Sequence, residues 1–317
     1  MSLSLTEEQV ETYRRDGCLL LRGFLSSEET RDMVRWVNDM ATWCKPTQAQ
    51  SLSGSHYTFH YESLHVEGEE GGLARVPALC RVENFTPFHG GLDALARERL
   101  APVCAQVLGQ PVALFKEKLN IKPAGGKGYA AHYDGPSAAA LGLARTFVTA
   151  QVAVDAQTVE NGCLQVVRPR ARWPPGQDMV PPSSSDPDRG GRVGAIPEAV
   201  AEELEWEPVE CSPGDVLLFD HWMPHRSHFN RSTQERRVLY LLFNPASEGD
   251  FRDQYYRLFA QLRAEAAAAA AVAVPAAVPA EANAGAAAAT SSGSENAAAE
   301  ASEASDNAQQ DLLASFA

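Results

Sequence analysis

The segment that most constrains the fold is Ser212–Ser227, which reads Ser-Pro-Gly-Asp-Val-Leu-Leu-Phe-Asp-His-Trp-Met-Pro-His-Arg-Ser. Its Pro-Gly-Asp turn leads into a short apolar run, a pattern typical of a buried strand that is bounded by turn residues. His225 follows this run, and a second strand-like segment, Arg236–Phe243, comes after a short loop. A double-stranded β-helix presents the distal ligand of its metal site in this way. We therefore expect a mainly β fold with flanking helices and a double-stranded β-helix (jelly-roll, cupin-like) core.

A second motif, His132-Tyr133-Asp134, supplies two more candidate metal ligands. On an extended strand, side chains two residues apart point to the same face, so His132 and Asp134 are expected to reach one ion together. With His225 they make two imidazoles and one carboxylate, a set that leaves three coordination positions open and is typical of non-heme Fe(II) oxygenases. Arg236, eleven residues after His225, would hold the far carboxylate of 2-oxoglutarate as a planar cation. The prediction is a catalytic set of these four residues, with Fe(II), 2-oxoglutarate and O2.

Several neighbouring residues compete for these roles. His221 and His228 are alternatives to His225, but the spacing to Arg236 favours His225. Arg237 competes with Arg236; strand alternation places the two on opposite faces, so Arg237 is expected to form an outward salt bridge. Ser227 is predicted to hydrogen-bond the same distal carboxylate of the cosubstrate. The other histidines are expected at the surface or the substrate entrance, and they are His56, His60, His65 and His89.

The combination of motifs resembles the phytanoyl-CoA dioxygenase family. The resemblance runs from about Leu5 to Leu258. It is carried by His132/Asp134, by His225-Arg-Ser-His-Phe-Asn230, by Arg236 and by Asn161-Gly-Cys-Leu164. Within the family, three segments are most similar to the phosphonate hydroxylases, namely Leu114–Asn120, Val152–Asp155 and Asn244–Asp250. This subgroup implies hydroxylation of 2-aminoethylphosphonate, or its trimethylammonium analogue, at the carbon next to phosphorus, with release of succinate and CO2.

Four polar residues alternate along one predicted strand: Lys116, Lys118, Asn120 and Lys122. They could form a solvated edge face, or an inward face that binds anions. Similarity to ectoine hydroxylases implies that Lys116 contacts substrate and that Asn120 and Lys122 serve 2-oxoglutarate. Lys118 is assigned to the substrate with Lys116, because compact point charges suit a small phosphonate. Gln151 matches a position that lines the cosubstrate in phytanoyl-CoA hydroxylase, although the residue type differs.

Two other functions stay open. One is a hydroxylase of the same family that acts on an acyl-CoA, a quaternary amine or a secondary metabolite. The other is a non-catalytic cupin-like binding module, which would not need the complete set of metal ligands and arginine. The expected partner is a small-molecule substrate, and the oligomeric state is left open.

Charge and cysteine usage exclude several classes of protein. The formal net charge is −14, and half of it comes from acidic residues after Arg263, where no Lys or Arg occurs. An acidic body gives no electrostatic footprint for nucleic acid or anionic membrane. No apolar run is long enough for a membrane span. The six cysteines have no paired spacing, which favours free thiols and a cytoplasmic location.

The chain is expected to form one oxygenase domain, residues 1–263, and an Ala-rich acidic disordered tail, residues 264–317. Thr6 and Gln9 predict a capping box at the start of a first helix. A short strand at Cys18, a helix from Ser26 and a helix over Leu92–Leu108 are expected to follow. The proline- and serine-rich segment Trp173–Pro197 is predicted to be an active-site lid.

Overall fold

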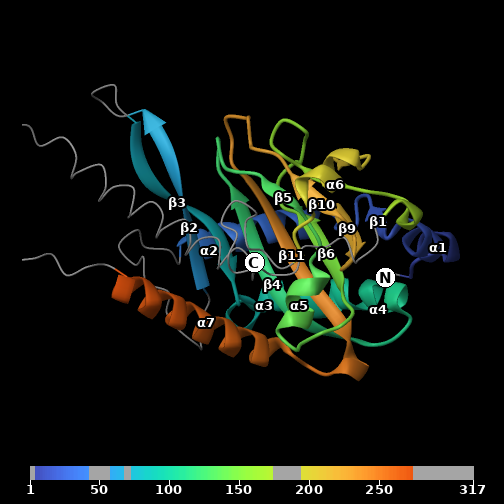
Figure 1. The fold of residues 1–317 in the computed structure, drawn as a ribbon. Coiled ribbons are helices and arrows are strands. Elements are labelled where there is room, and N and C mark those ends of the chain that lie inside the picture. Colours follow the sequence, from blue (N-terminus) through green and yellow to red (C-terminus); the bar gives the residue numbers. More distant parts are fainter. Residues whose placement is uncertain (1–3, 43–57, 68–72, 174–193, 274–317) are drawn as a thin grey trace, which may run out of the picture.

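The computed structural model describes residues 4–42, 58–67, 73–173 and 194–273, and its strands form two antiparallel sheets (Figure 1). The larger sheet has seven strands in the order β1-β9-β6-β11-β4-β3-β2, and the smaller has four in the order β5-β10-β7-β8. The strands are β1 (Cys18–Leu21), β2 (Thr58–Glu67), β3 (Leu73–Glu83), β4 (Val112–Lys122), β5 (Tyr129–His132), β6 (Val148–Ala153), β7 (Leu164–Val166), β8 (Glu207–Val209), β9 (Val216–Asp220), β10 (His225–Ser227) and β11 (Arg236–Pro245). The expected mainly β fold is confirmed.

Helices cover one face of the larger sheet. They are α1 (Glu7–Asp16), α2 (Ser27–Thr42), α3 (Gly90–Ala94), a π-helical turn η2 (Leu95–Leu100) and α4 (Ala101–Leu108). The remaining helices are α5 (Gly135–Ala140), α6 (Glu198–Glu203) and α7 (Arg252–Ala273), with 3₁₀ turns η1 (Thr86–Phe88), η3 (Arg170–Arg172) and η6 (Ala246–Glu248). Met33 and Met40 of α2, both 0% exposed, pack in the same cluster as Leu239 and Leu241 of β11. Such burial stabilises the fold by roughly 1.5–3 kcal/mol per side chain.

The predicted beginning of the chain is confirmed in detail. The Thr6 side chain accepts a hydrogen bond from the backbone N–H of Gln9, and the Gln9 side chain accepts one from the backbone N–H of Thr6. These two bonds satisfy donors that the first turn of a helix leaves without intrahelical partners. The helix ends at Gly17, which has a φ of 76°. The expected third helix also forms, divided between α3, η2 and α4.

The opposite face of the larger sheet is turned toward the smaller sheet. Leu217 and Phe219 of β9 pack in one cluster with Leu164 and Val166 of β7, so apolar contacts join the two sheets. Side chains along β11 therefore alternate between the two faces of the sheet. Leu239 and Leu241 belong to the helix-covered core, whereas Tyr240 between them faces the smaller sheet.

A bulge changes this alternation in β4. Leu242 of β11 is paired with Lys116, but the next residue, Phe243, is paired with Leu114. Phe115 is thus the extra residue on β4. As a result Leu114 joins the helix-covered core, while Phe115 packs with Tyr255 in a separate cluster on the other side.

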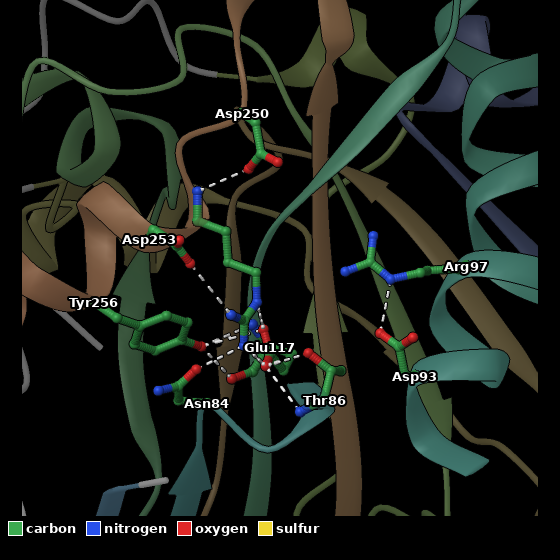
Figure 2. Close-up of polar contacts among 9 residues, drawn as sticks. Asn84, Thr86, Asp93, Arg97, Glu117, Asp250, Asp253 and Tyr256 are labelled. Carbon is green, nitrogen blue, oxygen red and sulfur yellow. Dashed lines mark hydrogen bonds and ion pairs between the residues drawn. The ribbon is translucent and has the colours of Figure 1, made fainter. Parts of the chain in front are cut away.

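A buried polar network attaches α7 to this strand (Figure 2). Glu117 of β4 is 0% exposed and accepts hydrogen bonds from the hydroxyl and backbone N–H of Thr86, at 2.8 and 3.2 Å. Arg252 donates to both oxygens of the same carboxylate and also to Asn84, and the Tyr256 hydroxyl lies 3.4 Å from Glu117 Oε2. The network fixes the first turns of α7 against the sheet.

Two predictions extend beyond the described residues. The predicted lid, Trp173–Pro197, lies largely outside them, so its role stays a prediction. Helix α7 continues past Arg263 to Ala273, and the rest of the expected tail is outside the described part. The domain boundary and the disorder of the tail also stay predictions.

Candidate metal centre

Strand pairing brings two of the predicted metal ligands together. In the smaller sheet β10 pairs with β5, and His225 lies directly opposite His132. The centroids of the two imidazole rings are 4.1 Å apart. Both side chains are buried, with 5% exposure for His132 and 6% for His225. One register position of a short antiparallel pair therefore brings together two histidines that are 93 positions apart in the sequence.

Asp134 reaches the same place by a different route from the one predicted. The extended strand ends at His132, and Asp134 has helical backbone angles, φ −81° and ψ −32°, as the N-cap residue of α5. The expectation that His132 and Asp134 share one face of a strand is wrong. The turn is fixed because the backbone N–H of Gly135 donates to the carbonyl of His221 and Pro136 lies in the first turn of the helix. The Asp134 side chain makes no capping hydrogen bond to α5.

The three side chains fit a divalent transition metal. Ligand atoms of His132, Asp134 and His225 all lie within 4.8 Å of one another, and we call these residues the metal cluster. Each histidine Nε2 lies 3.8 Å from a different oxygen of Asp134. Each Nδ1 is within 3 Å of a backbone carbonyl, that of Ala130 or that of Met223, which directs both Nε2 atoms toward the carboxylate. This donor set suits Fe(II) with open positions.

Strand β11 begins with a buried arginine that has unused hydrogen-bonding capacity. Arg236 is 4% exposed; its Nη1 donates to Gln157 at 3.4 Å and its Nη2 to the carbonyl of Gly162 at 3.2 Å. Its Nε has no hydrogen-bond partner, nor do Gln157 Nε2 and Gln151 Oε1. Since buried polar groups are normally satisfied, these atoms mark a place for a polar ligand. Two donors on Arg236 and Gln157 fit the distal carboxylate of 2-oxoglutarate.

Lys122 and Ser227, both predicted to serve the cosubstrate, contact each other. Lys122 Nζ donates to Ser227 Oγ at 2.9 Å and to the carbonyl of His228 at 2.6 Å. Asn120 Oδ1 accepts a hydrogen bond from Arg81 at 3.1 Å. Ser227 Oγ also accepts a hydrogen bond from the backbone N–H of Tyr129, so it connects Lys122 and Tyr129 at the edge of the site.

The lysine face of β4 is an interior face. Strand β4 lies between β11 and β3, and Lys116 is 5% exposed, so the alternative of a solvated edge face is wrong. Lys116 Nζ lies 4.8 Å from the ring centroid of Tyr255, and Lys118 Nζ lies 5.3 Å from that of Tyr240. Burial lowers the pKa of Lys118 well below its usual value, and the positive charges of Lys116 and Arg81 add to the effect.

The competing residues are placed elsewhere. His221 packs against Phe147 and its Nδ1 lies 3.3 Å from Asp220, and it is not part of the metal cluster. His228 is exposed. Arg237 donates to both oxygens of Asp155 at 2.8 Å, so the predicted salt bridge is confirmed. His89 caps α3 through Nδ1.

The sequence interpretation missed residues that line the same face. Arg81 and Glu83 of β3 lie opposite Asn120 and Lys118 of β4, and Arg81 also donates to the Tyr129 hydroxyl at 3.2 Å. The alternation Arg-Val-Glu at the end of β3 could have indicated a polar strand face. The other missed residues are Gln157, Tyr129 and Tyr255.

Comparison with known proteins adds an independent result. Residues 13–238 match the family model described as phytanoyl-CoA dioxygenase (PhyH). The chain is 36% identical over 267 residues to a methylphosphonate hydroxylase from Gimesia maris. The match covers 83% of this chain and 91% of the relative. It is 31% identical to a 2-aminoethylphosphonate dioxygenase from an uncultured bacterium, HF130_AEPn_1, over 80% of this chain and 86% of the relative.

Solved structures agree on the fold. A structure of EctD from S. alaskensis with bound Fe superposes with a TM-score of 0.56 at 19% identity, covering 77% of this chain and 78% of EctD. This similarity confirms the predicted jelly-roll core. Among the described residues, no helix is long and apolar enough to cross a membrane. The buried cysteines Cys18, Cys104, Cys163 and Cys211 are free thiols, as predicted.

Proposed function

Because the chain belongs to the phytanoyl-CoA dioxygenase family and is a non-heme Fe(II)- and 2-oxoglutarate-dependent dioxygenase, we propose that it hydroxylates a small phosphonate. The best candidate is a 2-aminoalkylphosphonate, hydroxylated at the carbon next to phosphorus. The observation that carries the proposal is the interior cationic face of β4 beside the metal cluster, with Lys116 5% exposed. Identity of 31–36% to two enzymes named for phosphonates supports it.

Each residue of the site has a proposed role. His132, Asp134 and His225 would hold Fe(II), and Arg236 would hold the distal carboxylate of 2-oxoglutarate with help from Gln157. A buried planar guanidinium suits this task because it can donate two parallel hydrogen bonds to one carboxylate.

A second group of residues shapes the cosubstrate site. Lys122 holds Ser227, and Gln151 bonds to Gln157 at 3.3 Å, so the cosubstrate residues support one another. Asn120, fixed by Arg81, would lie toward the proximal end of 2-oxoglutarate.

When bound, Fe(II) with 2-oxoglutarate and O2 supplies the oxidant that replaces a C–H hydrogen by hydroxyl, leaving succinate and CO2. The protein binds and orients the substrate. The dianion would lie against Lys116 and Lys118, which are two residues apart on one strand face. Lys116 is buried and Lys118 is partly buried, which limits the access of water to that contact and strengthens it. The rings of Tyr255 and Tyr240 each lie within cation–π distance of one of these lysines.

The test is succinate formation by the Fe(II)-loaded enzyme with a panel of substrates. 2-Aminoethylphosphonate or its N-methylated forms should stimulate succinate formation and gain one hydroxyl next to phosphorus. Phytanoyl-CoA and ectoine should give background rates. Stimulation by an acyl-CoA and by no phosphonate would overturn the proposal while leaving the dioxygenase class intact.

A further inference from the structure

Glu83 is a fully buried carboxylate whose hydrogen-bonding capacity is unused. It is 0% exposed, and neither of its oxygens has a hydrogen-bond partner. Its nearest cations are Arg81 Nη1 at 3.5 Å and Lys116 Nζ at 3.8 Å from Oε1. Charge-assisted hydrogen bonds to a carboxylate are usually about 2.7–2.9 Å long, so these contacts are ion pairs without hydrogen bonds.

Glu83 nevertheless stays ionised. Burial alone would raise its pKa, but Lys116, His60 and Arg81 outweigh burial and lower the pKa of Glu83 to about 2. A carboxylate that is charged, buried and not hydrogen-bonded is costly to keep. A donor that entered this space would recover part of that cost.

Glu117 provides an internal comparison on the neighbouring strand. It is equally buried, but its oxygens accept from Thr86 and Arg252. It lies on the helix-covered side, where its role is to hold α7. Glu117, a buried carboxylate with a structural cation, is thus hydrogen-bonded through both oxygens, and Glu83 is not.

The position of Glu83 relates it to the substrate. Glu83 lies directly opposite Lys118 in the pairing of β3 with β4. The charges of Asp134 and Glu83 both act to raise the pKa of Lys118, against the larger effects of burial, Lys116 and Arg81, so Lys118 lies within electrostatic reach of the metal cluster and of Glu83. Directly opposed side chains have Cβ atoms about 4.5–5.5 Å apart. A cation and an anion joined by two carbons would fit that separation.

We propose that Glu83 binds the ammonium group of a zwitterionic substrate while Lys118 and Lys116 bind its phosphonate, so that the enzyme selects aminoalkylphosphonates over phosphonates without a cation. The inference rests on the proposed function and extends it from the substrate class to the group that is recognised. The unused oxygens of Glu83 are the acceptors for the ammonium protons. Arg81 is held away from them by its hydrogen bonds to Asn120 and Tyr129.

The test compares two ligands of matched shape. Binding to the enzyme loaded with Fe(II) and 2-oxoglutarate is measured by anaerobic calorimetry, so that no turnover occurs, with 2-aminoethylphosphonate and with propylphosphonate, in which a methyl replaces the ammonium. The wild-type enzyme should bind 2-aminoethylphosphonate more tightly by about tenfold or more. Glu83→Gln should weaken its binding by about 30-fold or more and change the binding of propylphosphonate by less than about threefold.

Glu117→Gln is the matched control, because it neutralises a buried carboxylate of the same sheet on the other face. It should lower thermal stability and leave the ratio of the two affinities unchanged. If Glu83→Gln weakened both ligands equally, Glu83 would be a structural counterion and the proposal would be overturned.

A ligand-side test keeps the proposal falsifiable if Glu83→Gln does not fold. N-acetyl-2-aminoethylphosphonate and propylphosphonate, neither of which is cationic, should both bind the wild-type enzyme more weakly than the parent amine. If propylphosphonate and methylphosphonate bound as tightly as the amine and were hydroxylated, the phosphonate function would stand and the role of Glu83 would fall. If no phosphonate bound or stimulated turnover, the proposed function itself would fail.

Discussion

Replacing Arg236 by Gln tests the assignment of the cosubstrate site. The guanidinium is 4% exposed and its Nε has no hydrogen-bond partner, while its Nη atoms make long contacts of 3.4 and 3.2 Å with Gln157 and Gly162 and the group also bonds to Tyr240. Part of its donor capacity, including Nε, is therefore available to a ligand. Removing one partner of a buried charge pair costs about 2–5 kcal/mol, and the Gln amide retains part of the interaction, so about 2–3 kcal/mol is expected.

That loss corresponds to a rise of roughly 30- to 140-fold in the Kd for 2-oxoglutarate. Anaerobic calorimetry with Fe(II) present measures this Kd directly, and the KM for 2-oxoglutarate in a succinate assay should rise with it. Arg237→Gln is the control, because Arg237 is adjacent in sequence but bonds to Asp155. Its Kd for 2-oxoglutarate should change by less than about threefold, as a partly exposed ion pair contributes little. Equal effects of the two substitutions would refute the assignment.

Three further predictions concern the metal, the substrate and the fold. Alanine at any position of the metal cluster should abolish turnover and also iron binding, which metal analysis measures. His221→Ala and His228→Ala should retain both properties. An inactive His221→Ala enzyme that still bound iron would call for another role of that residue. Lys116→Met should lose phosphonate-stimulated succinate formation while calorimetry still detects 2-oxoglutarate binding, and unchanged stimulation would remove Lys116 from the substrate site. Arg252→Met should destabilise the protein by about 3–5 kcal/mol in urea unfolding, because it leaves Glu117 buried without its cation; a change below about 1 kcal/mol would contradict the proposed attachment of α7.

Local signals in the sequence predicted much of this architecture. The Thr6 and Gln9 capping box depends only on residues three apart, so the sequence determines it directly. Arg237 could be placed outside the site because strand alternation is a two-residue rule. Both the jelly-roll core and the two histidines followed from strand and motif patterns.

Other features depend on tertiary contacts and could not be predicted. Asp134 leaves the strand because Gly135 bonds to His221, which is distant in the sequence. Glu83 and Gln157 were missed for a related reason, because the role proposed for each depends on a partner that is distant in the sequence. The partner is Lys118 for Glu83 and Arg236 for Gln157. A single strand pattern contains no information about its neighbour in the sheet.

The extra residue Phe115 has a consequence for how this protein could change. Because a strand alternates its faces, an insertion or deletion of one residue exchanges them. Phe115 is such an insertion, and it allows Leu114 to pack under the helices while Lys116 points to the opposite side. Deleting Phe115 would make Leu114 and Lys116 adjacent, and regular alternation would then keep them on opposite faces, so the main loss would be the packing of Phe115 against Tyr255. Loss of this one residue would therefore preserve both faces, whereas a one-residue deletion between Lys116 and Lys122 would exchange the lysine face with the apolar face over part of β4.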